Sequence, residues 1–183
     1  MSVSISGHSR ALYAGDTNAL LRLFNAVRAD IAALIGVLTG TGLLTLPGLT
    51  IGTSDPTKVK NVATTVQFAD VQSTLALGET AMVGNIPHVV VSMVGVPREA
   101  TYAVSLDNAG TVHVTQGTIT NAGLSVAPAT PAGQILLGTV KILTDGSGAY
   151  TAGTTHLDDA TLTTTYTDAT LLNAVLSSPN LVA

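Results

Sequence analysis

The chain contains no cysteine and no tryptophan. The absence of cysteine excludes disulfide bonds and thiolate metal sites, and it makes the fold indifferent to the redox state of its compartment. Aromatic residues of all kinds make up only 3 % of the sequence, which leaves few side chains for stacking on nucleotide bases. These absences argue against a disulfide scaffold, a zinc module and a single-strand-binding module.

Charge is also scarce. Charged residues make up 10 % of the 183 residues, far below the roughly one quarter that is usual. The seven Lys and Arg residues are scattered and form no basic stripe along which a phosphate backbone could lie, so we expect no nucleic-acid partner. A surface with so little charge needs cover from other chains or solvation by Thr, Ser and Asn, and we expect both.

Segments that direct a chain to a membrane are not predicted. The first residues have neither a basic region nor a following apolar region, so no signal peptide is expected. Residues 31–54 are uncharged and long enough to span a bilayer. Gly36, Gly40 and Pro47 interrupt this run, and no basic cluster flanks it. We therefore expect no membrane span.

A helix is predicted over residues 17–38, following Asp16 as a capping residue type. Its large apolar residues recur at spacings of 4, 3, 4, 3 and 4, the heptad pattern of a coiled coil. The residues of this seam are Leu20, Phe24, Val27, Ile31, Leu34 and Leu38. Leu23 and Ile35 widen the seam, which favours three or more helices over two. An amphipathic helix packed on its own domain shows the same pattern, but the low charge of the chain favours self-association.

The character of the chain changes after Pro47, where β-branched residues dominate and Gly, Asn, Asp and Pro separate short runs. We therefore divide the chain into an N-terminal arm with an oligomerisation helix, residues 1–46, and a β domain with a short C-terminal tail, residues 47–183. Strands are predicted at 59–67, 87–94, 101–106, 111–116, 134–144 and 160–166.

The turns between these strands complete the predicted fold. Asp107–Gly110 predicts a hairpin, residues 144–150 are a second hairpin candidate, and 145–159 connect the last two strands. The tail is expected to form a short helix capped by Asp168. Short strands separated by regular turns predict a mainly β fold, a small antiparallel β-sandwich or barrel with an N-terminal amphipathic, coiled-coil-like helix.

No set of residues predicts a reaction. The four histidines, His8, His88, His113 and His156, are not at ligand spacing from one another, and His88 precedes a strand that we expect to be buried. His156 with Asp158 and Asp159 is the one local cluster of hard ligands, and a solvated turn explains it better than a cation site. The Asp145–Gly148 stretch lacks the later ligands of a calcium loop. We predict no catalytic residue, no metal and no cofactor, and therefore no enzyme.

One segment resembles a known family. Residues 131–168 combine Pro131 and Gly133 with an apolar strand, a Gly/Ser turn, the run Tyr150-Thr-Ala-Gly-Thr-Thr155 and a Thr-rich strand that ends at Tyr166. This pattern is similar to virion structural proteins of tailed bacteriophages, of the head-fibre or capsid-decoration type. The hairpin at 104–117 is similar to that group as well. The resemblance carries no catalytic residues over.

The resemblance and the composition together imply a structural role. We expect a homo-oligomer, most simply a trimer, that binds the phage capsid or other virion proteins and is located at the capsid surface after synthesis in the host cytoplasm. The alternative is a tail-fibre component or a protein that binds a host receptor or glycan. Both readings describe binding without catalysis.

The seam generates the first prediction. Ile31→Asp is expected to weaken assembly, because an unpaired charge buried in an apolar seam costs several kcal/mol. Light scattering of the wild type and the variant at micromolar concentration measures the effect. A wild-type chain that is a stable monomer under these conditions would contradict the predicted oligomer.

Overall fold

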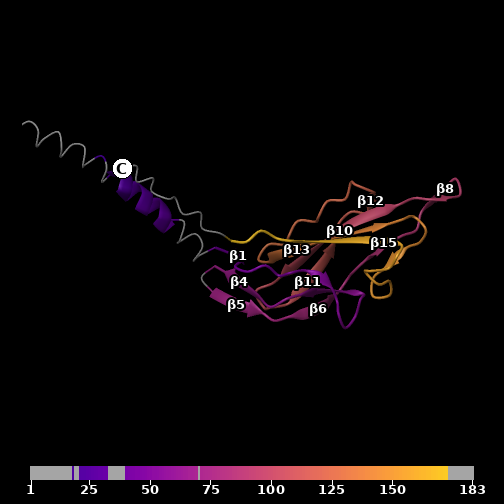
Figure 1. Ribbon diagram of the computed structural model, residues 1–183, viewed down its shortest axis with the longest axis horizontal. Helices are drawn as coiled ribbons and strands as arrows, with labels where there is room; N and C mark the ends of the chain where they lie inside the picture. Colours follow the sequence, from indigo (N-terminus) through magenta and orange to yellow (C-terminus); the bar gives the residue numbers. More distant parts are fainter. Residues whose placement is uncertain (1–17, 19–20, 33–39, 70, 173–183) are drawn as a thin grey trace, which may run out of the picture. The chain divides into compact units, whose positions relative to one another are not determined.

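The computed structural model describes residues 18, 21–32, 40–69 and 71–172 (Figure 1). The chain divides into two compact units. One comprises Met1–Gly40 together with Asn173–Ala183, and its described part is the helix of residues 21–32. The other, Thr41–Leu172, contains all the described strands and is called the β unit below.

The described helix carries the middle of the predicted seam. Phe24, Val27 and Ile31 are 73 %, 47 % and 51 % exposed. The other three seam residues, Leu20, Leu34 and Leu38, lie outside the described residues. The helical character is as expected, whereas its association with other helices stays a proposal.

The β unit is mainly antiparallel, which confirms the predicted mainly β class. Its strands are β1 (Gly42–Leu43), β2 (Thr50–Ile51), β3 (Lys58–Asn61), β4 (Thr64–Phe68), β5 (Val71–Leu75), β6 (Gly78–Ala81), β7 (Asn85–Ile86), β8 (Val90–Val91), β9 (Val94–Gly95), β10 (Arg98–Leu106), β11 (Val112–Gln116), β12 (Thr120–Asn121), β13 (Ile135–Thr144), β14 (Tyr150–Thr151) and β15 (Leu162–Asp168). They form several sheets, and within the described residues none of these closes on itself.

The largest sheet has the order β11-β10-β13-β15, with β12 paired to β10 as well. Its strands match the predicted strands at 101–106, 111–116, 134–144 and 160–166. The predicted hairpin at Asp107–Gly110 joins β10 to β11, and Leu106 pairs with Val112. The Asp107 carboxylate accepts hydrogen bonds from the backbone N–H groups of Ala109 and Thr111, and Gly110 has a φ of 85°.

Strands β13 and β15, which the sequence predicts as two strands of one β domain, are antiparallel neighbours. Their register runs without interruption from Thr144 opposite Leu162 to Gly138 opposite Asp168. On its other side β13 pairs with β10, and this register shifts between Val104 and Ser105, where β13 contains an extra residue. Such a bulge bends the strand locally.

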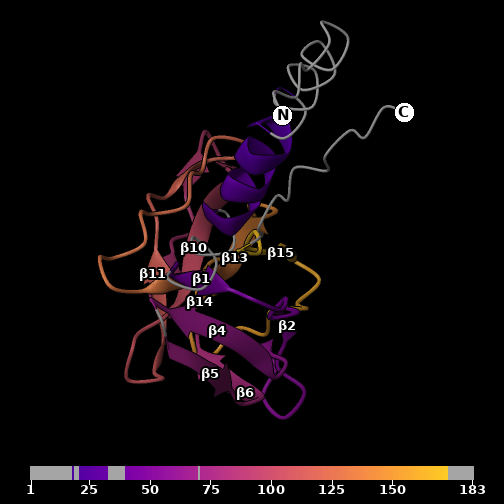
Figure 2. The same cartoon turned by 90° about the vertical axis from the view of Figure 1, so that its left-hand side faces the viewer.

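The sheets that contain β4 and β6 lie against the largest one, with the core between them. Figure 2 shows β4, β5 and β6 on one side of the unit and β10, β13 and β15 on the other. The core draws fully buried residues from both sides, among them Val66 on β4 and Val104, Val140 and Ile142 on the long strands. The rings of Tyr102 and Tyr150 meet edge to face within this core, with centroids 6.4 Å apart.

The predicted strand at 59–67 is wrong as a single element, because the chain leaves the strand at Val62 and enters a different sheet at Thr64. Asn61 explains the break. Its buried side-chain amide donates to the carbonyl of Val62 and, across the turn between β5 and β6, to the carbonyl of Ala76. The Thr64 hydroxyl also donates to the Val62 carbonyl and fixes the corner.

Two further expectations are wrong because of contacts between residues that are distant in the sequence. Residues 144–150 are not a hairpin, because β14 pairs with β7 and not with β13. Asp168 does not begin a helix, since it ends β15 and its carboxylate accepts hydrogen bonds from the backbone N–H groups of Gly48 and Leu49. The part of the predicted tail helix after Leu172 lies outside the described residues.

The close contact at Gly138 generates the second prediction. A Cβ atom at this position would lie 2.4 Å from the carbonyl oxygen of Thr167 and 2.6 Å from Cδ1 of Leu49. Gly138→Ala is therefore expected to destabilise the fold by about 1–3 kcal/mol in chemical denaturation, the usual cost of overpacking a core.

The matched control is Gly148→Ala, because nothing lies within 4 Å of the Cβ that it would add. Its effect is expected to stay within about 0.5 kcal/mol. Equal stability of the two variants would show that β13 and β15 are not in this close contact.

Candidate functional site

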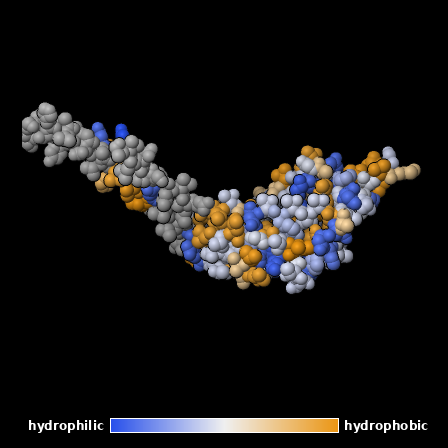
Figure 3. All heavy atoms as spheres, viewed as in Figure 1, coloured by the Kyte–Doolittle hydropathy of each residue, from blue (hydrophilic) through white to orange (hydrophobic). Residues whose placement is uncertain are grey.

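An exposed hairpin is the most unusual surface feature of the β unit. Strands β8 and β9 pair Val90 with Gly95 and Val91 with Val94 around the two-residue loop Ser92–Met93. Val90, Val91 and Val94 are 53 %, 58 % and 66 % exposed, and Met93 is 98 % exposed. Hydrophobic side chains gather at the end of the unit that carries β8 (Figure 3). We call residues Val90–Gly95 the apolar hairpin.

The loop of the apolar hairpin has a strained backbone. Ser92 and Met93 have φ angles of 50° and 67°. A two-residue hairpin loop with positive φ at both positions follows the type I′ pattern, which strongly favours Asn-Gly. This conformation costs Ser and Met roughly 1–2 kcal/mol per residue, because their Cβ atoms crowd the following carbonyl group. A strained turn that places a methionine in solvent points to a function of that methionine.

The base of the apolar hairpin is held firmly. Gly95 approaches the turn after β13 so closely that a Cβ at Gly95 would lie 1.7 Å from the carbonyl oxygen of Gly146. The backbone N–H of Val96 donates to the Val89 carbonyl at 2.8 Å. The first contact places the base of the hairpin against the turn after β13, and the second joins its two arms.

The sequence around the apolar hairpin has no charge. No Asp, Glu, Lys or Arg occurs between Glu79 and Arg98.

The predicted buried strand at 87–94 is wrong in both extent and burial, because its apolar residues form short strands that are exposed to solvent. Pro87 and Pro97 on either side, with Ser92 at the centre, were the sequence signals of a projecting loop. An exposed apolar patch of this kind is typical of a protein–protein contact.

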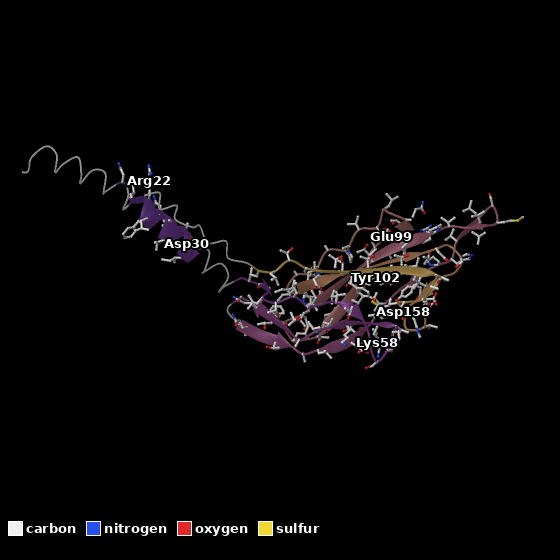
Figure 4. The ribbon with its side chains drawn as sticks, in the orientation of Figure 1. Arg22, Asp30, Lys58, Glu99, Tyr102 and Asp158 are labelled. Atoms are coloured by element: carbon white, nitrogen blue, oxygen red, sulfur yellow. The ribbon has the colours of Figure 1, made fainter. Side chains whose placement is uncertain are left out.

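A buried carboxylate is the most unusual polar group. Glu99 lies on β10 and is 1 % exposed (Figure 4). One oxygen accepts hydrogen bonds from the hydroxyl and the backbone N–H of Ser125, and the other from the backbone N–H of Gly123 at 3.1 Å. The Lys141 ammonium lies 2.9 Å from the second oxygen. Glu99 thus joins β10 and β13 to the loop after β12.

These contacts keep Glu99 ionised. Burial alone raises the pKa of a carboxyl, but the hydrogen bonds from Ser125, Lys141 and the backbone of Gly123 outweigh it and lower the pKa of Glu99 to about 2. A group with so low a pKa is a poor proton donor or acceptor near neutral pH. Glu99 is therefore a structural anchor, and the sequence signal for it is a carboxylate that follows Arg98 in a strand whose other residues are uncharged.

The histidines that the sequence singled out are not brought together. His156 Nδ1 is 3.9 Å from Asp158, and both side chains are more than half exposed. Asp159 instead accepts hydrogen bonds from the backbone N–H and hydroxyl of Thr161. His113 Nε2 lies 2.8 Å from Asp107. Among the described residues no group of three His, Cys, Asp or Glu side chains is placed to hold a metal ion.

Residues 131–168, which carry the family resemblance, contribute strands to two sheets of the β unit. They comprise β13, the connection with β14, and β15. Leu157 is buried in the connection, its N–H donates to the Pro56 carbonyl, and its own carbonyl accepts from the Thr164 hydroxyl. The turn at Asp145 is closed by hydrogen bonds from the backbone N–H and hydroxyl of Ser147.

Comparisons with protein-family models, curated proteins and solved structures find no match for the chain. No helix within the described residues is long and apolar enough to cross a membrane. The apolar part of the run at 40–54 instead contributes β1 and β2 to the β unit.

The buried carboxylate generates the third prediction, on acid stability. Because the pKa of Glu99 is lower in the folded chain than its ordinary value, Glu99 stabilises the fold above about pH 4.5 and loses this effect as the pH falls towards 2. Glu99→Gln is expected to be less stable than the wild type at pH 7. The difference should shrink by up to about 3 kcal/mol between pH 5 and pH 2.

Urea denaturation at a series of pH values measures this difference. The control is Glu79→Gln, since Glu79 accepts its hydrogen bonds from Thr53 and Ser54 at an exposed site and its change with pH should be smaller. A stability difference between wild type and Glu99→Gln that stays constant from pH 7 to pH 2 would contradict the assignment.

Proposed function

We propose that the protein is an oligomeric structural protein of a bacteriophage virion, a capsid-decoration or head-fibre protein that acts by binding and catalyses no reaction. The apolar hairpin carries the proposal. A rigid base, a strained turn and an uncharged tip together describe an element that inserts into an apolar recess of another protein. The virion partner is the capsid or a protein attached to it.

The helix supports self-association. The described helical residues 21–32 expose three apolar residues at seam spacing. An exposed apolar seam of this kind is stabilised when other helices cover it. Parallel helices of other copies would cover Phe24, Val27 and Ile31 and stabilise all of them. The width of the seam favours a trimer, and the helix then forms a coiled coil.

The β unit supports the resemblance to head-fibre and decoration proteins. We infer that its sheets form a two-layered sandwich, with the largest sheet as one layer. The segment that carries the resemblance supplies two strands of that sheet and the turn against which the apolar hairpin rests, through Gly146. The resembling segment and the proposed attachment element are therefore in direct contact.

Binding of glycans, part of the alternative reading, is less well supported. Sugar sites use exposed aromatic rings as platforms, and the described tyrosines do not offer them. Tyr102 and Tyr150 are fully buried, and Tyr166 is half-buried. A tail-fibre role differs from capsid decoration only in the virion partner, and the binding experiment below separates the two.

The fourth prediction concerns the strained turn of the apolar hairpin. Replacing Ser92 and Met93 together by Asn and Gly supplies the residues that a type I′ loop prefers and removes the exposed methionine. The double variant is expected to be more stable than the wild type by about 1–2 kcal/mol. It is also expected to bind purified capsids of the parent phage at least about tenfold more weakly, a loss of about 1.4 kcal/mol.

Cosedimentation with capsids and with isolated tails measures binding, and urea denaturation measures stability. Leu124→Ser is the control, because it removes an apolar side chain that is 67 % exposed at another place on the β unit. Capsid binding by the double variant at wild-type strength would exclude the hairpin as the attachment element. Wild-type binding to tails alone would move the protein to the tail fibre, and binding to neither would refute the proposal.

A further inference from the structure

Strand β15 forms an open edge of the largest sheet. It pairs with β13 on one side, and it ends the strand order β11-β10-β13-β15. With seven residues it is longer than the other edge strands of the described sheets. Within the described residues, the backbone groups of Thr163–Asp168 make no hydrogen bond across their outer side. The outer edge is therefore a row of N–H and C=O groups that face no strand.

This edge lacks the features that usually protect such strands. Native edges carry a proline, a bulge or a charge, lysine above all, which stops them from pairing with other chains. Leu162–Asp168 contains no proline, and its register with β13 shows no bulge. Its one charged residue, Asp168, lies at the end and is bound to the N–H groups of Gly48 and Leu49.

The two faces of β15 differ. Leu162, Thr164 and Tyr166 are half-buried, and the hydroxyl of Thr164 is bound to the Leu157 carbonyl of the preceding connection. Thr163, Thr165 and Thr167 are exposed and form a line of hydroxyl groups along the other face. The strand is thus anchored by its inner face while its edge and outer face are free.

We propose that β15 pairs antiparallel with β15 of a second copy of this chain, around a two-fold axis at Thr165. In this register Thr165 lies opposite itself, Thr163 opposite Thr167 and Leu162 opposite Asp168. The two largest sheets become one continuous sheet, and their exposed threonines form a single ladder. Cross-strand threonine pairs stabilise antiparallel strands.

The charges near this axis permit the pairing. Each Asp168 lies at an end of the paired strands, opposite an uncharged leucine. On β13, Lys141 is the neighbour of Thr165, and its ammonium is bound to Glu99. Asp158 and Asp159 belong to the connection before β15, and Asp159 is bound to the N–H and hydroxyl of Thr161. From Thr163 to Thr167 the paired strands place no charged residue opposite another. The pairing is a different contact from the helix seam, and it does not depend on the virion role.

The absence of cysteine from the chain allows a direct test, the fifth prediction. Residues opposite each other in antiparallel strands have Cα atoms about 4.5–5.5 Å apart, within the range of a disulfide. Under mild oxidation, Thr165→Cys is expected to form a covalent dimer, seen on non-reducing gels. Thr163→Cys or Thr167→Cys alone should not do so, while an equal mixture of these two should give the dimer.

Thr74→Cys is the matched control, because Thr74 is an exposed threonine on β5, an edge strand of a different sheet. Pairing raises the effective concentration of the thiols, so Thr165→Cys should cross-link at least about tenfold faster than the control. Circular dichroism checks that each variant is folded. Equal rates for Thr165→Cys and Thr74→Cys would overturn the proposal, and so would cross-linking of Thr163→Cys with itself, which indicates a parallel arrangement or an antiparallel register centred elsewhere.

Discussion

The pairing of β10 with β13 is the contact on which the rest of the β unit depends. Both strands are long and largely buried, and every other strand of the largest sheet is attached to one of them. Glu99 and Lys141 form their ion pair across these two strands, and this pair holds the loop that contains Gly123 and Ser125. The turn after β13 in turn supports the apolar hairpin through Gly146. Core, loop and candidate contact surface are thus connected through two strands.

The sequence predicts these strands because their signals are local. Residues 134–144 and 160–166 are β-branched runs bounded by turn residues, which predicts two strands of one β domain, while their direct antiparallel pairing is a finding of the structure. The break at Asn61 could not be predicted in this way, because it depends on the Ala76 carbonyl, which belongs to a different turn. The pairing of β14 with β7 is equally non-local. Nothing near either segment indicates these contacts.

The exposure of the apolar hairpin could not be predicted from the local sequence either. A run such as Val89-Val-Val91 predicts a strand, and apolar strands are usually buried, so the sequence alone places it in the core. Its exposure follows from the loop at Ser92–Met93 and from the contact of Gly95 with Gly146, which is distant in sequence. The Glu99 site also depends on distant partners, Ser125 and Lys141. Burial and exposure are properties of the whole fold, and a local pattern does not determine them.

Most carboxylates of the β unit accept hydrogen bonds in turns and loops. Asp55, Asp145 and Asp159 each accept hydrogen bonds from the backbone N–H and the hydroxyl of the Ser or Thr two residues later. These bonds are the leading cause of the lowered pKa of each of the three carboxyls.

Glu79, Glu99, Asp107 and Asp168 are bound to backbone N–H groups as well. These carboxylates remain charged, but they are bound to turns and loops. No charged residue lies at the centre of β15 or in the apolar hairpin. The chain thus uses its few carboxylates to stabilise turns and loops, while the two surfaces proposed for association carry no charge that would repel another chain.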